Sequence, residues 1–271
     1  MTDFELIVVD DGSTDGSLEW LRSQTEQIVL LSQTNRGPGA ARNLGAKEAT
    51  GEFLAFLDSD DLWFPWTLQT YQSVIHGNGN PSFIAGKPFR FGEDKAAANA
   101  RSSPTRVNAF RDYLASGSEW RWWGASSFVI RRDAFLACGG FTDEWVNGED
   151  ADLALRLGIA PGFVQIIEPF TFAYREHEVS AMKSLPKTLA GARLQVKAEL
   201  AGCYPGGETR SRERQHILAR QIRPVTFDCL KKGLRNDAWQ LYQATFAWNL
   251  ALGRWKYLLG FLCKSLFNQQ G

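Results

Sequence analysis

The sequence predicts an α/β fold in which a mostly parallel sheet is flanked by helices. Two apolar runs without alternation, at residues 5–9 and 53–57, have the composition of strands that are covered on both faces. Each run ends in a cluster of carboxylates, which are Asp10-Asp11 in the first case and Asp58-Ser59-Asp60-Asp61 in the second. Because ligands of open α/β sheets bind outside the carboxyl ends of the strands, these two acidic strand ends are the predicted active site.

Strand and helix signals alternate along the first part of the chain. Strands are expected at 5–9, 28–31 and 53–57, and helices at 17–24, 39–49 and 65–76. This order implies right-handed crossovers in a doubly wound sheet. Further on, we expect one or two strands within 83–91, strands at 126–130 and 164–167, and helices at 132–138 and 149–157. From residue 186 the pattern is helical, with breaks at 204–207 and near Gly233.

The net charge of zero hides an asymmetry between two parts of the chain. Residues 1–180 carry 15 Lys and Arg against 25 Asp and Glu, whereas residues 181–271 carry 15 against 5. We therefore divide the chain into a catalytic domain, residues 1–182, and a basic helical extension, residues 183–271. A basic extension can dock on acidic protein, on anionic lipid or on nucleic acid. We expect packing on the acidic domain and no nucleic acid partner.

Cysteine usage and hydropathy favour a cytoplasmic protein. The four cysteines are scattered without metal-ligand spacing or a disulfide framework. No basic and apolar leader follows Met1, and no run of about 18 apolar residues predicts a spanning helix. Peripheral contact with the inner face of the cell membrane is an alternative for the extension, where Trp239, Trp248, Trp255 and Phe261, with Lys and Arg in the same segment, could form an interfacial amphipathic helix.

The acidic strand ends suggest a metal and a nucleotide. Alternate carboxylates at 58–61 can bind Mg²⁺, which would offset the charge of a diphosphate leaving group. The alternative is a solvated turn before the helix that begins near Pro65. Asp10 or Asp11 could accept a hydrogen bond from a nucleobase, and the alternative is a turn in which Asp15 caps the following helix.

Three further motifs contain charged residues. Arg36 and Arg42 flank a glycine-rich helix start and could contact phosphate or order the acidic loops. Asp150 opens a helix, whose N-terminus should keep a carboxylate ionised and able to accept a proton. The alternative is ordinary acid enrichment of a first turn. His177 is a candidate metal ligand or a solvated surface histidine.

Taken together and in order, these motifs resemble a family 2 glycosyltransferase of the GT-A fold. The resemblance covers about residues 3–182. It rests on Val8-Val9-Asp10-Asp11-Gly12-Ser13-Thr14-Asp15, Asn35-Arg36-Gly37 with Ala41-Arg42-Asn43, Leu57-Asp58-Ser59-Asp60-Asp61, Gly139-Gly140-Phe141 with Gly148-Glu149-Asp150, and Tyr174-Arg175 with His177 and Ser180.

The resemblance implies a role for each of these positions. Asp58, Asp60 and His177 would hold Mg²⁺ or Mn²⁺ on the diphosphate. Asp150 would be the general base, and Glu149 would help to hold the acceptor. The donor-binding residues would be Asp10, Asp11, Asp15, Arg36, Arg42 and Asp58.

The implied reaction is an inverting displacement at the anomeric carbon. The donor would be a nucleoside-diphosphate sugar, with UDP or dTDP favoured, and the acceptor a glycan or lipid-linked molecule. Trp120, Trp122 and Trp123 could stack on the acceptor or pack in the core. An inactive relic that only binds nucleotide sugars or protein is the alternative. A nucleotidyltransferase is disfavoured because the sequence has no glycine-rich, Lys-containing loop after its first strand.

The chain departs from the family pattern in two ways. The family's first strand, loop and helix would precede the segment that matches residues 4–15. The resemblance places that strand between the strands at 5–9 and 53–57, so the edges of these two strands should be unpaired. Met1 would then be an internal residue, or the gene is truncated. A Gln-x-x-Arg-Trp motif is also missing, which argues against a processive, membrane-embedded synthase.

Overall fold

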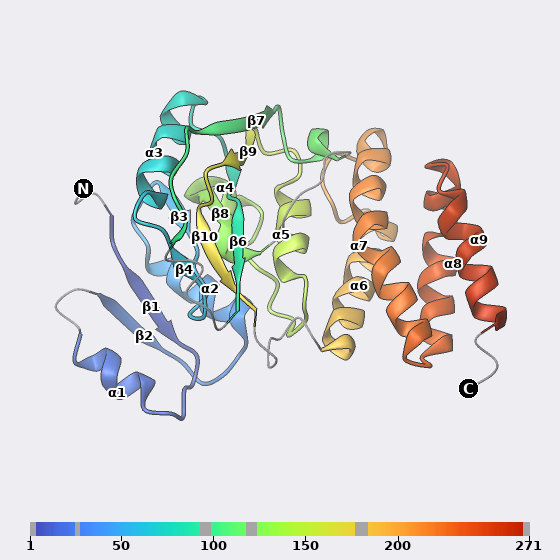
Figure 1. Cartoon of the computed structure of the whole chain (residues 1–271), viewed down its shortest axis with the longest axis horizontal. Coiled ribbons are helices and arrows are strands. Elements are labelled where there is room, and N and C mark those ends of the chain that lie inside the picture. The colour runs from blue at the N-terminus through green and yellow to red at the C-terminus, as the bar shows by residue number, and fades with distance from the viewer. Residues whose placement is uncertain (1–3, 25–27, 93–98, 118–123, 177–183, 268–271) are drawn as a thin grey trace.

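Strands and helices occupy different parts of the molecule. The computed structural model describes residues 4–24, 28–92, 99–117, 124–176 and 184–267. Figure 1 shows a small sheet, then a central sheet with flanking helices, then a bundle of long helices. Along this row the N-terminal segment lies at one end and the C-terminal helix at the other.

The central sheet has five strands in the order β3 (Phe53–Ala55), β8 (Phe128–Arg131), β5 (Phe83–Ala85), β9 (Phe163–Glu168) and β7 (Arg106–Phe110). β5 and β9 are parallel, and the other three neighbouring pairs are antiparallel. Ile84 and Ile130 are fully buried at its centre. The predicted α/β class is confirmed, and the strand pairing is mixed because β8 lies antiparallel between β3 and β5 and because β7 is antiparallel to β9.

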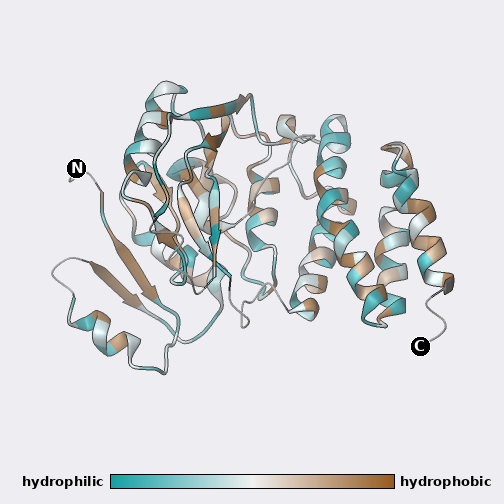
Figure 2. Cartoon of the chain, in the orientation of Figure 1, coloured by the Kyte–Doolittle hydropathy of each residue, from teal (hydrophilic) through white to brown (hydrophobic). Residues whose placement is uncertain are grey.

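The first two strands form a separate parallel sheet, β1 (Ile7–Asp10) with β2 (Val29–Ser32). Among the described strands, β1 pairs with no other partner and β3 pairs only with β8. This agrees with the expectation of two unpaired edges. Figure 2 shows β1 and β2 as apolar strands apart from the central sheet, and Leu6 is 50% exposed beside them.

A third sheet places the acidic strand end beside the last strand of the domain. β10 (Phe172–Arg175) lies between β4 (Leu62–Trp63), to which it is antiparallel, and β6 (Pro88–Phe91), to which it is parallel. The sequence did not predict β4, β7 or β10, because β4 has only two residues and neither β7 nor β10 contains an apolar run of four or more residues. Residues 83–91 form two strands, β5 in the central sheet and β6 in the third sheet.

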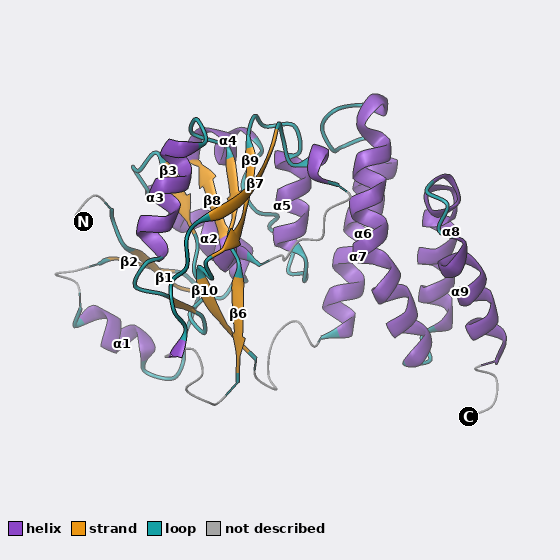
Figure 3. Cartoon of the chain, turned by 45° about the horizontal axis from the view of Figure 1, so that its top comes forward, coloured by secondary structure: helices purple, strands orange, loops and turns teal. Residues whose placement is uncertain are grey.

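The helices of the domain agree with the sequence to within two residues at either end. They are α1 (Ser17–Arg22), α2 (Pro38–Glu48), α3 (Thr67–Gly77), α4 (Arg132–Ala137) and α5 (Glu149–Leu157). Figure 3 shows α3 and α5 on opposite sides of the central strands. The helices thus cover the sheet from both sides, and α5 lies between the sheet and the C-terminal bundle.

The extension is a bundle of α6 (Leu185–Leu200), α7 (Ser211–Lys231), α8 (Arg235–Ala251) and α9 (Trp255–Phe267). One hydrophobic cluster runs from Leu54 and Phe128 in the sheet through Leu189 of α6 to Phe261 of α9. The extension therefore packs on the acidic sheet-containing part of the chain, as expected from the charge asymmetry. No helix in the described ranges has both the length and the apolar character that a bilayer crossing needs.

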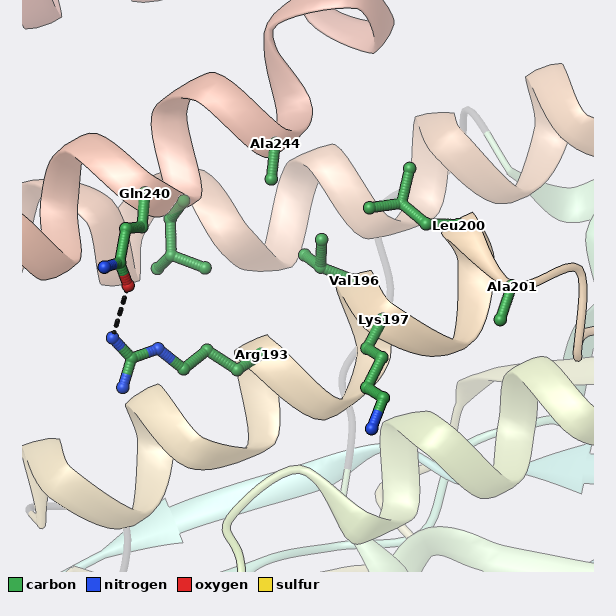
Figure 4. A pocket seen from close by; sticks show the side chains of 8 residues that line it. Arg193, Val196, Lys197, Leu200, Ala201, Gln240 and Ala244 are labelled. Carbon is green, nitrogen blue, oxygen red and sulfur yellow. Dashed lines mark hydrogen bonds between the residues drawn. The ribbon is translucent and has the colours of Figure 1, made fainter.

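A groove of about 460 Å³ lies between α6 and α8 in this bundle (Figure 4). Arg193 of α6 lines it and donates from Nη2 to Oε1 of Gln240 at 2.8 Å. Its lining residues all come from the extension. The groove is therefore separate from the acidic strand ends.

Candidate active site

Arg42 of α2 joins the acidic segment after β3 to the acidic first turn of α5. Its Nη2 lies 2.6 Å from Oδ1 of Asp58, which follows β3, and its Nη1 lies 2.8 Å from Oε1 of Glu149, the first residue of α5. The Arg42 side chain is only 13% exposed. Of the two roles considered for Arg42, the structure shows the ordering of the acidic loops.

A second link from α2 joins the motif that contains Asn43 to the Gly139-Gly140-Phe141 motif. The Asn43 amide donates to the Phe141 carbonyl at 2.9 Å and accepts from the Phe141 N–H at 2.8 Å. Gly140 has a φ of +70°, and a Cβ there would lie 2.5 Å from Oδ1 of Asn43. The Arg42 guanidinium also sits 5.1 Å from the centre of the Phe141 ring. The turn before α5 is thus fixed to α2.

Three carboxylates form a cluster at the end of β3. Asp58, Asp60 and Asp61 each offer an oxygen, and these atoms lie within 4.8 Å of one another. A set of carboxylate oxygens suits Mg²⁺ or Mn²⁺. Asp58 and Asp60 were predicted as ligands, whereas Asp61 was not.

Asp61 is the buried member of the cluster. Burial raises the pKa of its carboxyl to about 6, against the opposing effect of hydrogen bonds from Ser126 and from the Arg175 N–H. The latter bond, at 3.1 Å, ties the cluster to β10. The signal that distinguishes Asp61 is its burial under β10, which the local sequence does not show.

Asp150 is the residue for which the sequence predicted the role of general base. It lies in the first turn of α5, next to Glu149. Burial, followed by the charge of Glu149, raises the pKa of Asp150 to about 7. The helix N-terminus was expected to keep this carboxylate ionised, but the loss of hydration outweighs that effect. A carboxyl that titrates near neutrality can both accept and release a proton.

The extension holds the loop that leads into α5. Gln195 of α6 donates to the Gly148 carbonyl at 3.0 Å, and Asn147 donates to Oγ1 of Thr188 at 3.0 Å. Gly191 packs so closely that a Cβ on it would lie 1.9 Å from the Asn147 carbonyl oxygen. Sequence reasoning missed these contacts, because nothing within residues 183–271 signals contact with α5.

A buried hydrogen bond continues this support along α5. Tyr204, which follows α6, donates from its hydroxyl to Oδ1 of Asp152 at 2.7 Å. Asp152 also accepts from Arg156 one turn later, at 2.8 Å. The first two turns of α5 are therefore held by residues outside the predicted catalytic domain as well as within it.

The predicted nucleobase residues accept hydrogen bonds from the backbone of two loops. Asp11 accepts from the backbone N–H of Arg36 and of Gly37, each at 2.9 Å. Asp10 accepts from the N–H groups of Gly12 and Ser13, each at 3.3 Å. Hydrogen bonds, first of all from the Ser13 side chain, lower the pKa of Asp10. Asp11 thus binds the glycine-rich loop before α2, and Asp10 binds the turn after β1.

Of the remaining predicted residues, Asp15 precedes α1, Arg36 precedes α2, and the others lie outside the described chain. Asp15 accepts from the Ser17 N–H at 3.0 Å just before α1, and the N-cap residue of that helix is Gly16 rather than Asp15. Arg36 is exposed. His177 lies outside the described residues, as do the three tryptophans proposed for the acceptor, Trp120, Trp122 and Trp123.

Comparisons with known proteins identify the family. A family model described as "Glycosyl transferase family 2" matches residues 1–136. An uncharacterized glycosyltransferase of Haemophilus influenzae is 30% identical over 175 residues, which cover 63% of this chain and 58% of that protein. The succinoglycan biosynthesis protein ExoW of Rhizobium meliloti is 41% identical over 118 residues, 40% of this chain and 37% of that protein.

Solved structures give the same fold. S. aureus TarS 1-349 matches with a TM-score of 0.59 and 21% identity, covering 82% of this chain and 63% of that one. The crystal structure of the same protein in complex with UDP matches with a TM-score of 0.57, covering 80% and 61%. The chain spans about half the length of the curated relatives that match it over the longest segments. The match of the family model over half of the sequence shows that this chain belongs to glycosyl transferase family 2.

Proposed function

We propose that this chain is a metal-dependent, inverting glycosyltransferase that moves a sugar from a nucleoside-diphosphate sugar to a glycan or lipid-linked acceptor. The observation that carries the proposal is the bridge from Arg42 to Asp58 and Glu149. It brings the carboxylates suited to a metal and the candidate base into one site. Neither group alone would support a transfer reaction.

Asp60 and Asp58, with His177 as a further ligand, would hold Mg²⁺ or Mn²⁺. The metal would supply positive charge against the departing diphosphate. The three carboxylate oxygens at the end of β3 fit a hard cation in number and chemistry. Asp61, which the sequence reasoning left out, adds a third carboxylate to this set.

Asp150 would act on the acceptor. Its carboxylate takes the proton from the attacking hydroxyl as the oxygen bonds to the anomeric carbon and the bond to the diphosphate breaks on the opposite side. This geometry inverts the configuration at that carbon. Glu149, fixed by Arg42, would position the acceptor. A base with a pKa near neutrality suits this role.

The donor would bind against β1, β2 and the loop before α2, with Asp10, Asp11, Asp15 and Arg36 at its nucleotide end. UDP is favoured because the related fold of TarS has been solved with UDP, and a dTDP sugar is the closest alternative. The name of ExoW suggests a role in polysaccharide synthesis for the cell envelope. Within this scheme residues 1–182 are the catalytic domain and 183–271 the extension.

A panel of nucleotide sugars with Mn²⁺ tests this proposal. We expect one class of donor to raise the unfolding free energy by about 2.7 kcal/mol at a hundredfold excess over its Kd. The same donor should be consumed when acceptor glycans or water are present. Thermal stabilisation by no sugar nucleotide, with no turnover, would contradict the proposal.

One observation favours a second candidate, a chain that binds nucleotide sugars without turning them over. Within the described residues β1 is paired on one edge only, and the carboxylates of Asp10 and Asp11 already accept hydrogen bonds from the turn after β1 and from the loop before α2, respectively. Calorimetry separates the two functions. Donor binding without any detectable transfer or hydrolysis would favour this second candidate.

A further inference from the structure

The last helix presents an apolar stripe to solvent. Trp255, Leu259, Leu262 and Leu266 follow one another at spacings of four, three and four residues, which places them on one face of α9. Their exposed fractions are 57%, 60%, 38% and 67%. We call these four residues the α9 stripe. Four large apolar side chains this exposed on one short helix are unusual for a surface that meets only water.

The opposite face of α9 is firmly packed, so the orientation of the α9 stripe is fixed. Phe261 is fully buried and stacks on Tyr242 of α8, with ring centres 4.1 Å apart. Lys264 lies over Phe227 of α7 at 4.7 Å. In Figure 1 α9 lies at the end of the bundle farthest from the sheets. The α9 stripe therefore points away from the bundle.

The stripe differs from the apolar surface that the sequence suggested. Trp248 and Phe261 are buried, and Trp239 is partly buried against the core of the bundle, so these three serve packing. Trp255 is the member of that predicted set that lies on the exposed face. On α8, Phe246 and Leu250 are each 41% exposed one and two turns after Tyr242, which places them near the junction with α9.

Positive charge gathers where the α9 stripe begins. Arg254 directly precedes Trp255, and Lys256, which follows it, is exposed. Burial and the nearby guanidinium groups of Arg223 and Arg220 lower the pKa of Arg254 to about 10. The Nε of Arg254 is buried and finds no hydrogen-bond partner in the described parts of the chain. The segment where α9 begins thus carries one partly buried cation, Arg254, beside the arginines of α7, and one exposed cation, Lys256.

We propose that the α9 stripe docks on an anionic lipid surface, with Trp255 and the leucines entering the interface and the neighbouring cations meeting the headgroups. Helices that lie on membranes combine Trp and Leu on one face with Lys and Arg beside them. A second copy of the chain fits less well. Residues 181–271 carry 15 basic against 5 acidic side chains, so two copies would repel each other.

The small size of the α9 stripe also favours a lipid surface over a second copy of the chain. Stable protein interfaces use about 20–30 residues on each side, far more than this stripe and its neighbours supply. A lipid surface needs no shape complementarity, and it can accept a narrow row of apolar side chains. The inference is independent of the proposed reaction, because it concerns a surface on the helix farthest from the acidic site.

Flotation of the full chain with vesicles tests the proposal. We expect the chain to float with vesicles that contain phosphatidylglycerol and to remain unbound with pure phosphatidylcholine. Raising the salt concentration should weaken binding, because screening acts on the headgroup contacts. The double variant Leu259→Gln/Leu262→Gln should reduce the bound fraction by at least about tenfold.

A matched control uses exposed apolar residues elsewhere. Leu136 and Ile159 in the catalytic domain are 50% and 47% exposed. The double variant Leu136→Gln/Ile159→Gln loses comparable apolar surface and should float as the parent does. Lys256→Glu should weaken binding to phosphatidylglycerol several-fold while the helical circular dichroism stays unchanged.

A local probe reports on α9 itself. Cys263 is exposed next to the α9 stripe, and Cys203 is the other exposed cysteine of the described chain. In a Cys203→Ser variant, an environment-sensitive dye on Cys263 should shift to the blue when anionic vesicles are added. Absence of both flotation and a dye shift would overturn the proposal. A dimer in light scattering that Leu259→Gln/Leu262→Gln dissociates would assign the stripe to a second copy instead.

Discussion

The two ends of the candidate site are built in different ways. We call the segment around β1 and β2 the nucleotide end, because we propose that the nucleotide binds there, and the segment around the proposed general base Asp150 the base end. At the proposed nucleotide end, β1 and β2 form a two-stranded sheet whose strands pair with no other described strand, and Leu6 and Val29 are half-exposed. At the base end, α5 contacts α2 through Arg42 and α6 through Gln195, and most of its residues are buried. Changes at the base end should therefore act on catalysis and stability together, whereas changes on β1 should act mainly on local stability and donor binding.

The largest expected effect is on turnover at the base end. Asp150→Asn removes the proton acceptor but keeps the shape of the side chain, so transfer should fall by about 10²–10⁴-fold. Donor affinity by calorimetry should stay within a factor of two or three of the parent, since the proposed nucleotide site lies at the other end. Loss of donor binding in this variant would reject the base role of Asp150.

Replacement of Arg42 should damage both folding and activity. Arg42→Gln leaves Asp58 and Glu149 without their shared cation in a half-buried site, at a cost of about 3–5 kcal/mol. Denaturant unfolding measures this loss. The matched control is Arg131→Gln, which removes a pair with the exposed Asp133 and should cost less than about 1 kcal/mol.

The contact between α6 and the loop before α5 gives a matched pair of glycine variants. Gly191→Ala places a methyl group against the Asn147 carbonyl and should destabilise the chain by about 1–3 kcal/mol while lowering kcat. Gly260→Ala on α9 has open space around the new methyl group and should be neutral or stabilising, by about 0.5–1 kcal/mol. Equal stability of the two variants would remove the role of α6 as a support of the base.

The pH dependence follows from the raised pKa of Asp150. Turnover should rise with pH through about 7, because the carboxyl must be ionised to accept a proton. Folding shows the opposite trend, since between about pH 4 and pH 7 the folded chain retains a proton that the unfolded chain releases. The melting temperature of Asp150→Asn minus that of the parent should therefore increase as the pH rises over that range. Above that range this difference should stay constant. A gain that is the same at pH 4 and pH 8 would contradict the raised pKa.

The smallest expected effect lies at the nucleotide end. Leu6→Ser changes a half-exposed residue beside β1 and should alter stability by less than about 0.5–1 kcal/mol. Leu54→Ala in β3, where the side chain is 6% exposed, should cost about 2–5 kcal/mol. Similar losses in the two variants would show that β1 is part of the same cooperative core as the central sheet.

Much of the domain could be predicted from the sequence because its signals are local. The apolar runs ending at Asp10 and Asp58, the glycine before α2 and the acids that open α5 all mark element boundaries within a few residues. The exact partners were not predictable in this way. Asp61 becomes distinctive only when β10 buries it, and Gln195 only when α6 packs on Gly148. Long-range packing also raises the pKa of Asp150, against the local helix effect on which the sequence reasoning relied.

Metal-dependent turnover in the parent chain and in Asp60→Ala is the most direct test of the proposed function. The measurement is hydrolysis or transfer of the donor that stabilises the chain, with Mn²⁺ present and after removal of Mn²⁺ by a chelator. We predict turnover that depends on Mn²⁺ in the parent chain and is lost in Asp60→Ala, because Asp60 belongs to the carboxylate cluster at the end of β3. Undiminished turnover in Asp60→Ala, or turnover that survives the chelator, would contradict the metal site.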